Sequence, residues 1–381
     1  MPPLALLATA RAPLAAFGAM GVLWGGFAAT LPDLKAMLGV SEGALGVMLL
    51  GTPLAGVAAM LIAAQAGSAL GRFALPAGVL AMAAAFALPG HLAAPALFVL
   101  ALLACGATTG LLDVLMNARV AALEAARGAH LMNLCHAGYS LGYGISAIMV
   151  GVLRAEGLPP GVVMSAPATV ALILALVAIE RDGRIEGLRR PARGAGSGLG
   201  IVPLIGGAIV LIAFMSEHAA EAWSALHIEK TLGGSPAEGA MGPATLALTM
   251  AAARLAGQSL VARVAPVRLI AGGAAISAMG AIIAAAASGP AMAYAGFVVM
   301  GIGSSVIAPM ALSLVGRLAA PEARARAIAR ATLYGYFGYF FGPPTLGLIA
   351  EVVGLRGAFV FAAVALGFVP LLARLIGRRG A

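Results

Sequence analysis

The chain has 381 residues, of which 62% are hydrophobic and only 10% are charged, and its mean hydropathy is +1.03. This number of polar residues is too small to cover the surface of a soluble domain of this length. The composition therefore excludes a water-soluble protein. The formal net charge of +9 comes from basic loops between apolar stretches, which indicates contact with anionic lipid and not a nucleic-acid surface.

Apolar stretches long enough to cross a bilayer recur along the whole chain. A hydrocarbon core of about 30 Å takes roughly 20 residues of helix, and a backbone without water must form its hydrogen bonds within its own segment. We therefore predict an all-α membrane protein with twelve transmembrane helices, and with loops too short to form a soluble domain. The spans are expected to begin near Pro13, Gly43, Phe73, Ala94, Leu131, Gly161, Ile201, Gly239, Pro266, Ala291, Ala327 and Gly357.

The basic residues predict the orientation, because Lys and Arg in short loops stay on the cytoplasmic side. With the N-terminus inside, 18 of the 23 basic residues fall in inner loops and tails. Four fall in outer loops, namely Lys35, Arg154, Lys230 and Arg356, and Arg254 lies within a span. We therefore expect both termini in the cytoplasm.

The longest polar stretch, 180–200 (ERDGRIEGLRRPARGAGSGLG), divides the chain near its midpoint. It is basic, rich in glycine and without a periodic apolar face, which is typical of a flexible linker. We expect a six-helix bundle in 1–180, a cytoplasmic linker in 181–200 and a second six-helix bundle in 201–381.

The two halves repeat short motifs in the same order. The second span opens with SEGALG at 41–46 and the eighth with AEGAMG at 237–242, while Trp24 and Trp223 occupy similar places in their halves. Ordered matches of this kind indicate duplication of a six-helix unit. Such a repeat suits alternating access, in which two similar units rock about a site near the membrane midplane.

Four stretches carry a resemblance to a known family. They are GLLDVLMNARV with Asp113 and Asn117, HAGYSLG with His136 and Tyr139, SEHAAEAWSALHI with Glu217, Glu221 and Trp223, and GPPTLGLIAE with Pro343 and Pro344. The chain resembles the major facilitator superfamily of secondary transporters, and more narrowly its bacterial inner-membrane members near the fucose-permease branch. The resemblance implies two bundles around a cavity lined by the first, fourth, seventh and tenth helices. The loops at 67–72 and 257–259 depart from the family, since they lack its usual acidic residue.

Ionisable side chains inside spans are costly, which makes each a functional candidate. Asp113 and Asn117 share one face of the fourth span at a spacing of four residues. They suit cavity or proton work, with a structural hydrogen bond or a place among the cytoplasmic headgroups as the alternative. His136 in the fifth span suits either solute binding or a bond between helices.

The seventh span contains the densest polar cluster. Glu217 and Glu221 are one turn apart, and two carboxylates that close cannot comfortably both ionise in a low-dielectric site. At least one is therefore expected to hold a proton, as proton coupling requires. The alternative is a solvated outer interface with Trp223 in the aromatic belt. His218 and Glu221 lack a clear third ligand, so no metal site is predicted.

Arg254 is placed about eight residues from the inner end of the eighth span, or about 12 Å deep. On the same reasoning Glu217 is about 24 Å from the inner end, which disfavours a direct pair. We expect Asp113 or His136 as the partner of Arg254, with an anion ligand or a backbone carbonyl as alternatives. Tyr336 belongs to an aromatic run before Pro343 and Pro344, where a kink suits either gating or packing.

The function predicted from these features is secondary active transport of a small polar or amphipathic solute by alternating access, through proton-coupled symport. Export by proton antiport is the alternative, and a membrane sensor is a remote one. We predict no enzyme activity, cofactor or nucleic-acid partner, and expect a monomer in the bacterial inner membrane. The residues predicted in the substrate or proton pathway are Trp24, Asp113, Asn117, His136, Tyr139, Glu217, Glu221, Trp223, Arg254 and Tyr336.

Overall fold

The computed structural model describes residues 3–127, 131–185, 200–257, 263–320 and 323–378, so 186–199 of the expected linker lie outside the described residues. Within these ranges every regular element is a helix. The predicted all-α fold class is confirmed. The chain forms two compact units. Unit 1 comprises Met1–Val40 and Met48–Pro191, and unit 2 comprises Ser41–Val47 and Ala192–Ala381.

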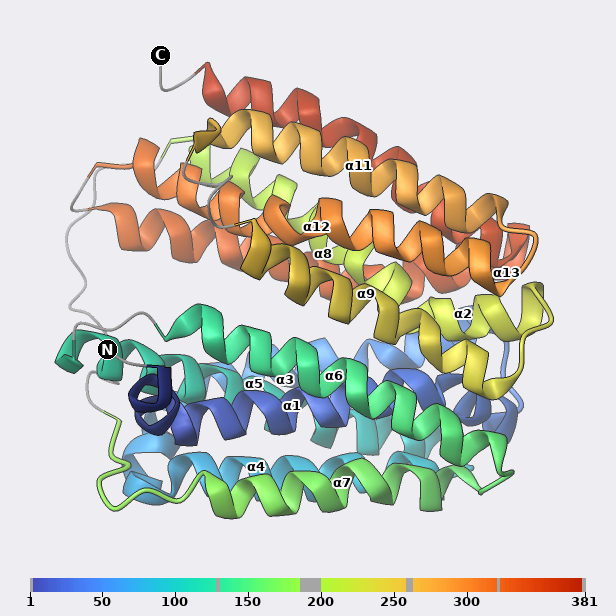
Figure 1. Cartoon of the computed structure of the whole chain (residues 1–381), viewed down its shortest axis with the longest axis horizontal. Coiled ribbons are helices and arrows are strands. Elements are labelled where there is room, and N and C mark those ends of the chain that lie inside the picture. Colours follow the sequence, from blue (N-terminus) through green and yellow to red (C-terminus); the bar gives the residue numbers. More distant parts are fainter. Residues whose placement is uncertain (1–2, 128–130, 186–199, 258–262, 321–322, 379–381) are drawn as a thin grey trace. The chain divides into compact units, whose positions relative to one another are not determined.

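Unit 1 contains long helices that lie side by side (Figure 1). They are α1 (Pro3–Leu38), α3 (Gly51–Leu70), α4 (Ala74–Ala87), α5 (Pro95–Arg127), α6 (Met132–Ala155) and α7 (Pro160–Val177), with the short turns η1 (Gly71–Phe73) and η2 (Pro89–His91). Small residues let these backbones approach closely, as membrane helices require. At Gly106 of α5 an added Cβ would stand 2.0 Å from the Thr52 carbonyl oxygen of α3.

Unit 2 contains the helices of the C-terminal half of the chain. They are α8 (Val202–Leu226), the π-helix η3 (His227–Thr231), α9 (Pro236–Ala256), α11 (Pro266–Ala286), α12 (Pro290–Leu318) and α13 (Arg324–Gly377). The helix α2 (Glu42–Leu49) begins in the short segment that belongs to this unit. There the Ser41 hydroxyl donates to Glu351 Oε2 of α13 at 3.1 Å.

In two places the helices do not match the expected spans one to one. The run α13 is interrupted at Gly354, whose φ of 78° and ψ of 167° suit only glycine, so two helices follow one another there. The helices α2 and α3 together fill the second expected span. Eight described stretches are long and apolar enough to cross a membrane, and two of them, of 50 and 52 residues, are long enough for two crossings each. This pattern is consistent with twelve spans.

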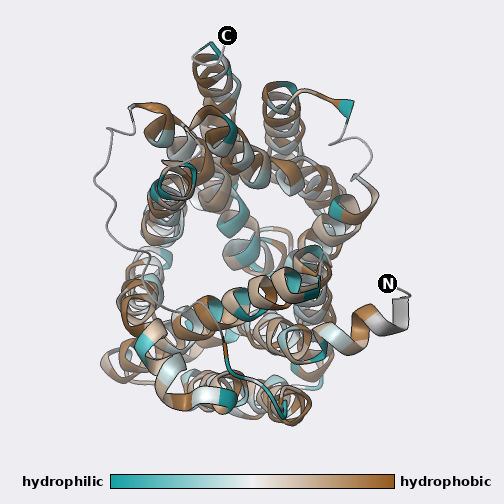
Figure 2. Ribbon diagram, turned by 90° about the vertical axis from the view of Figure 1, so that its left-hand side faces the viewer, coloured by the Kyte–Doolittle hydropathy of each residue, from teal (hydrophilic) through white to brown (hydrophobic). Residues whose placement is uncertain are grey.

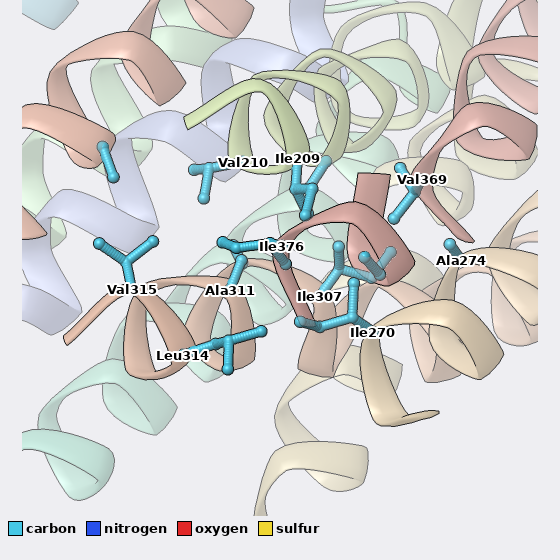
Figure 3. Packing of buried hydrophobic residues seen from close by; sticks show 14 of the residues in the cluster. Ile209, Val210, Ile270, Ala274, Ile307, Ala311, Leu314, Val315, Val369 and Ile376 are labelled. Atoms are coloured by element: carbon cyan, nitrogen blue, oxygen red, sulfur yellow. The ribbon is translucent and has the colours of Figure 1, made fainter. Parts of the chain in front are cut away.

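The surfaces of both units are apolar, as contact with lipid requires. Figure 2 shows hydrophobic colours over much of each helix, with hydrophilic residues toward helix ends and connections. Large apolar side chains are uncovered on these surfaces, and Val352 is 82% exposed. Inside unit 2, a dry core joins α8, α11, α12 and α13 through branched aliphatic side chains, among them Ile209, Ile270 and Ile307 (Figure 3). A soluble protein rarely exposes so much apolar surface.

One end of unit 1 is held by a buried arginine in the last turn of α6. Arg154 is 4% exposed, and its Nε and Nη2 donate to the two carboxylate oxygens of Asp33 at 2.7 and 2.6 Å. Its Nη1 donates to the Ala29 carbonyl oxygen at 2.7 Å. The sequence places Arg154 in an outer loop. The structure shows that its side chain also links α6 to α1.

We expect Arg154→Ala to lower the stability of unit 1 by about 2 kcal/mol, because hydrogen bonds to a charged partner contribute about that much and Asp33 keeps some solvent. Arg154→Lys should recover part of the loss, since an ammonium cannot form the bidentate pair. The measurement is the Tm of the detergent-purified protein, with the exposed Arg374→Ala as the control. An unchanged Tm for Arg154→Ala would mean that this ion pair contributes nothing.

Candidate functional site

The candidate residues of unit 1 lie on three helices. Trp24 of α1 packs edge-on against Phe86 of α4, with ring centroids 5.1 Å apart, and against Phe27 at 5.7 Å. These contacts show that Trp24 packs among aromatic rings within unit 1, and its predicted role in the pathway stays a prediction. His136 of α6 is exposed, and its ring meets Phe17 at 4.9 Å. Tyr139 lies one turn beyond His136, which places both side chains toward the same side of α6.

Asp113 and Asn117 of α5 form a local hydrogen-bonded pair. The Asn117 amide Nδ2 donates to Asp113 Oδ1 at 3.0 Å and to the Asp113 carbonyl oxygen at 2.8 Å. The spacing of four residues therefore brings the two side chains together, as the sequence predicts. Both are only partly buried, so the Asp113 carboxylate keeps an accessible side. A role of this pair in the transport pathway stays a prediction.

The densest set of ionisable side chains lies inside unit 2, on α8. Glu217 is only 5% exposed, Glu221 is half-buried one turn further on, and their charges act on each other. A π-helix, η3, continues α8 at its end. The carboxylates therefore lie within the helix packing of unit 2, which argues against the alternative of a solvated interface.

Arg254 supplies the positive charge of this cluster. The structure ends α9 at Ala256, with Gly257 as its cap, so Arg254 is in the last turn. Residues 258–262 lie outside the described residues, so the expected distance of about eight residues between Arg254 and the inner end of its span stays a prediction. Arg254 Nε donates to the Ser305 carbonyl oxygen of α12 at 3.5 Å, which fits the alternative of a backbone partner.

The charge of Arg254 also acts on both Glu217 and Glu221. The long arginine side chain brings its guanidinium within electrostatic range of carboxylates that helical rise alone placed out of reach. We therefore group Glu217, Glu221 and Arg254 as the carboxylate–arginine cluster. Asp113 and His136, the partners expected for Arg254, belong to unit 1, and that pairing stays a prediction.

Aromatic rings from α8 and α13 lie beside this cluster. Tyr339 stacks on Phe214 with ring centroids 4.6 Å apart, and Tyr336 meets the same ring at 6.2 Å. His218, next to Glu217 in the chain, approaches Tyr339 edge-on at 6.0 Å. The sequence pointed to Tyr336 and to the aromatic run around it. It did not reveal that these rings pack on α8, because that depends on which face of each helix meets the other.

Trp223 is fully buried inside unit 2. Gly347 of α13 makes room for it, since a Cβ there would stand 3.2 Å from the indole ring. The alternative of an aromatic-belt residue at the outer interface is therefore wrong for Trp223. His227 of η3 is also fully buried, and sequence reasoning did not select it. Its place at the end of a polar run on α8 was the only signal.

Comparison with known proteins adds independent findings. The profile of the Major Facilitator Superfamily matches residues 204–380. An uncharacterised MFS-type transporter of Yersinia pestis is 30% identical over 371 residues, which cover 95% of this chain and 94% of the relative. Among solved structures, the nucleoside transporter NupG gives a TM-score of 0.75 at 14% identity, covering 97% of this chain and 99% of NupG. The E. coli fucose:proton symporter FucP gives a TM-score of 0.60 at 16% identity, covering 96% of this chain and 98% of FucP. At these identities the structural matches show a shared fold.

Proposed function

Because the chain belongs to the major facilitator superfamily, a family of multi-pass membrane transporters and not of enzymes, we propose that it is a proton-coupled symporter. It would carry a small polar or amphipathic solute by alternating access. The observation that carries the proposal is the carboxylate–arginine cluster inside unit 2. Its residues are ionisable and their charges act on one another; Glu217 is buried, and Glu221 and Arg254 are partly buried.

The charges of the cluster do not balance without a proton. One arginine can offset one ionised carboxylate, and the second carboxylate then stands uncompensated in surroundings where an isolated charge is costly. Protonation of Glu217 or Glu221 removes that cost. A change of conformation that wets or uncovers the cluster would release the proton, and this couples proton movement to the transport cycle.

The neighbouring side chains support a solute site beside the cluster. Phe214, Tyr336 and Tyr339 offer ring faces and two hydroxyl groups, which together suit a solute with both apolar and polar surface. These same side chains also suit an amphipathic solute that is moved out of the cell. Export by proton antiport is therefore the second candidate. The two candidates differ in the direction of proton movement when solute is added.

The experiment that separates them needs a solute found first by thermal-shift screening, since a ligand of the folded state raises the Tm. The purified protein is then placed in liposomes that contain a pH-sensitive dye, with no imposed gradient. Symport predicts that external solute acidifies the lumen. Antiport predicts that it makes the lumen more alkaline, and a uniporter would leave the pH unchanged. Either of the last two outcomes overturns the symport proposal.

We also propose that the protein is a monomer in the bacterial inner membrane, with both termini in the cytoplasm. The division of the basic residues supports this orientation. Reporter fusions should place position 190 in the cytoplasm and Lys35 and Lys230 outside. Position 190 lies outside the described residues, within the expected linker 181–200. A reporter at position 190 that is active only outside the cell would reverse the orientation.

A further inference from the structure

Four polar side chains form a fully buried stripe along α8 and η3 in unit 2. We define the polar stripe as Ser216, Trp223, Ser224 and His227, each of which is 0% exposed. Among the described residues, one polar atom of each side chain has no hydrogen-bond partner, namely Ser216 Oγ, Trp223 Nε1, Ser224 Oγ and His227 Nδ1. The stripe extends from Ser216 to His227, a rise of about 16 Å along the helix.

The stripe faces one side of α8. At about 100° per residue, its four positions fall within about 100° of one another, and Glu217 borders them. Three other helices enclose that side. Gly242 of α9 leaves space for the Ser224 side chain and Gly347 of α13 for Trp223, while His227 Nε2 lies 3.0 Å from the Ala284 carbonyl oxygen of α11.

The two serines differ from several other hydroxyl groups that lie inside helices of this chain. Thr30, Ser165 and Thr332 each donate to the carbonyl oxygen four residues earlier in their own helix, at 2.7, 2.7 and 3.0 Å. Ser216 and Ser224 also sit inside a helix, but their hydroxyl groups turn away from that local acceptor. Each unpaired buried polar group costs about 1–3 kcal/mol. Four such groups side by side would be a heavy cost unless something binds them.

His227 indicates what the bound molecules must offer. A carbonyl oxygen only accepts, so Nε2 carries the hydrogen that it donates to Ala284, and Nδ1 of the neutral ring is an acceptor. Trp223 Nε1 is a donor, and each serine hydroxyl is both. Water is the small ligand that can donate and accept at every one of these atoms, and buried waters typically make two to four hydrogen bonds to such groups.

We propose that the polar stripe binds a file of water molecules inside unit 2, and that protons reach Glu217 and Glu221 along it from the η3 end. The proton-delivery step depends on the proposed proton coupling, whereas the water file does not. A proton enters at the water bound to His227, moves by exchange along the hydrogen-bonded file and protonates a carboxylate oxygen. No other bond is made or broken. With the orientation proposed above, the η3 end is the outer end.

The water file is tested first by radiolytic hydroxyl-radical labelling of the purified protein, read by mass spectrometry. Bound water should give oxidation of Trp223 although the residue is fully buried. Met82 and Met300 are intrinsically reactive and equally buried, and Met300 belongs to an apolar cluster; both should stay unlabelled. Absence of label on Trp223, or label on all three residues at similar rates, would overturn the water file whatever the transport mechanism.

Serine-to-alanine variants give a second test, because a dry stripe and a hydrated stripe predict changes in Tm of opposite sign. If the stripe is dry, Ser216→Ala and Ser224→Ala delete unpaired polar atoms and should raise the Tm. If it is hydrated, they remove a water ligand and should lower the Tm by a few degrees. Ser165→Ala, which loses only a bond within its own helix, is the matched control. A raised Tm in both stripe variants would contradict the proposal.

The proton path is tested with the liposome assay described above. Ser224→Ala should slow solute-driven acidification several-fold while leaving the thermal shift produced by the solute unchanged. If Trp223 is labelled but Ser224→Ala leaves the rate of solute-driven acidification unaltered, the waters have only a structural role. That result would overturn the proton path. Absence of any proton movement in the wild type would instead overturn the proposed symport while the labelling result stands.

Discussion

Glu217→Gln is expected to abolish accumulation of solute driven by a pH gradient while leaving exchange of solute across the membrane partly intact. The amide keeps the size and hydrogen-bonding capacity of the side chain but cannot gain or lose a proton. Glu217 is buried and interacts with Glu221 and Arg254, so its charge state controls the balance of the cluster. Uphill transport needs that change of charge, whereas exchange of labelled for unlabelled solute does not.

The measurement compares pH-driven uptake with counterflow in the same liposomes. Glu221→Gln and Asp113→Asn complete the series, and the exposed Glu156→Gln serves as the control. A loss confined to Glu217 and Glu221 would place proton coupling in unit 2. Full pH-driven accumulation in all three test variants would exclude these carboxylates as the proton carriers.

Much of the fold follows from the sequence because a bilayer restricts the choice of structure. Apolar length predicts where helices lie, and several described helices begin close to the expected starts, as at Pro266 and Pro290. The first helix is an exception, since α1 begins at Pro3 and not near Pro13. Helix ends were harder to predict. The break in α13 at Gly354, for example, depends on a single backbone conformation that apolar length does not reveal.

The candidate site was only partly accessible to sequence reasoning. The spacing of four residues was enough to bring Asn117 onto Asp113 and to place Glu221 beside Glu217. The buried position of Trp223 could not be predicted, because the polar residues around it suit either a buried site or a solvated outer interface. Nor could the polar stripe, since it depends on side-chain rotamers of Ser216 and Ser224 and on helices far apart in the sequence.

Arg254→Ala is expected to lower the stability of unit 2 by about 1–3 kcal/mol, because it removes the cation that acts on two carboxylates. Transport should be lost as well. The partner of Arg254 can then be identified by asking which second substitution restores the Tm. If Arg254 balances Glu217 and Glu221 within unit 2, adding Glu221→Gln removes the surplus negative charge and should restore a large part of the Tm. Adding Asp113→Asn should have no such effect.

The comparison forms a double-mutant cycle, in which a shared interaction appears as a coupling energy of about 1–3 kcal/mol. The Tm of each single and double variant, measured at one pH and in one detergent, gives both couplings. Rescue by Asp113→Asn and not by Glu221→Gln would restore the partner expected from sequence and separate Arg254 from the carboxylates of α8. Strictly additive effects with both would leave the Ser305 carbonyl oxygen as the principal partner, and Arg254 would then hold α9 to α12 without balancing the charge on which proton coupling depends.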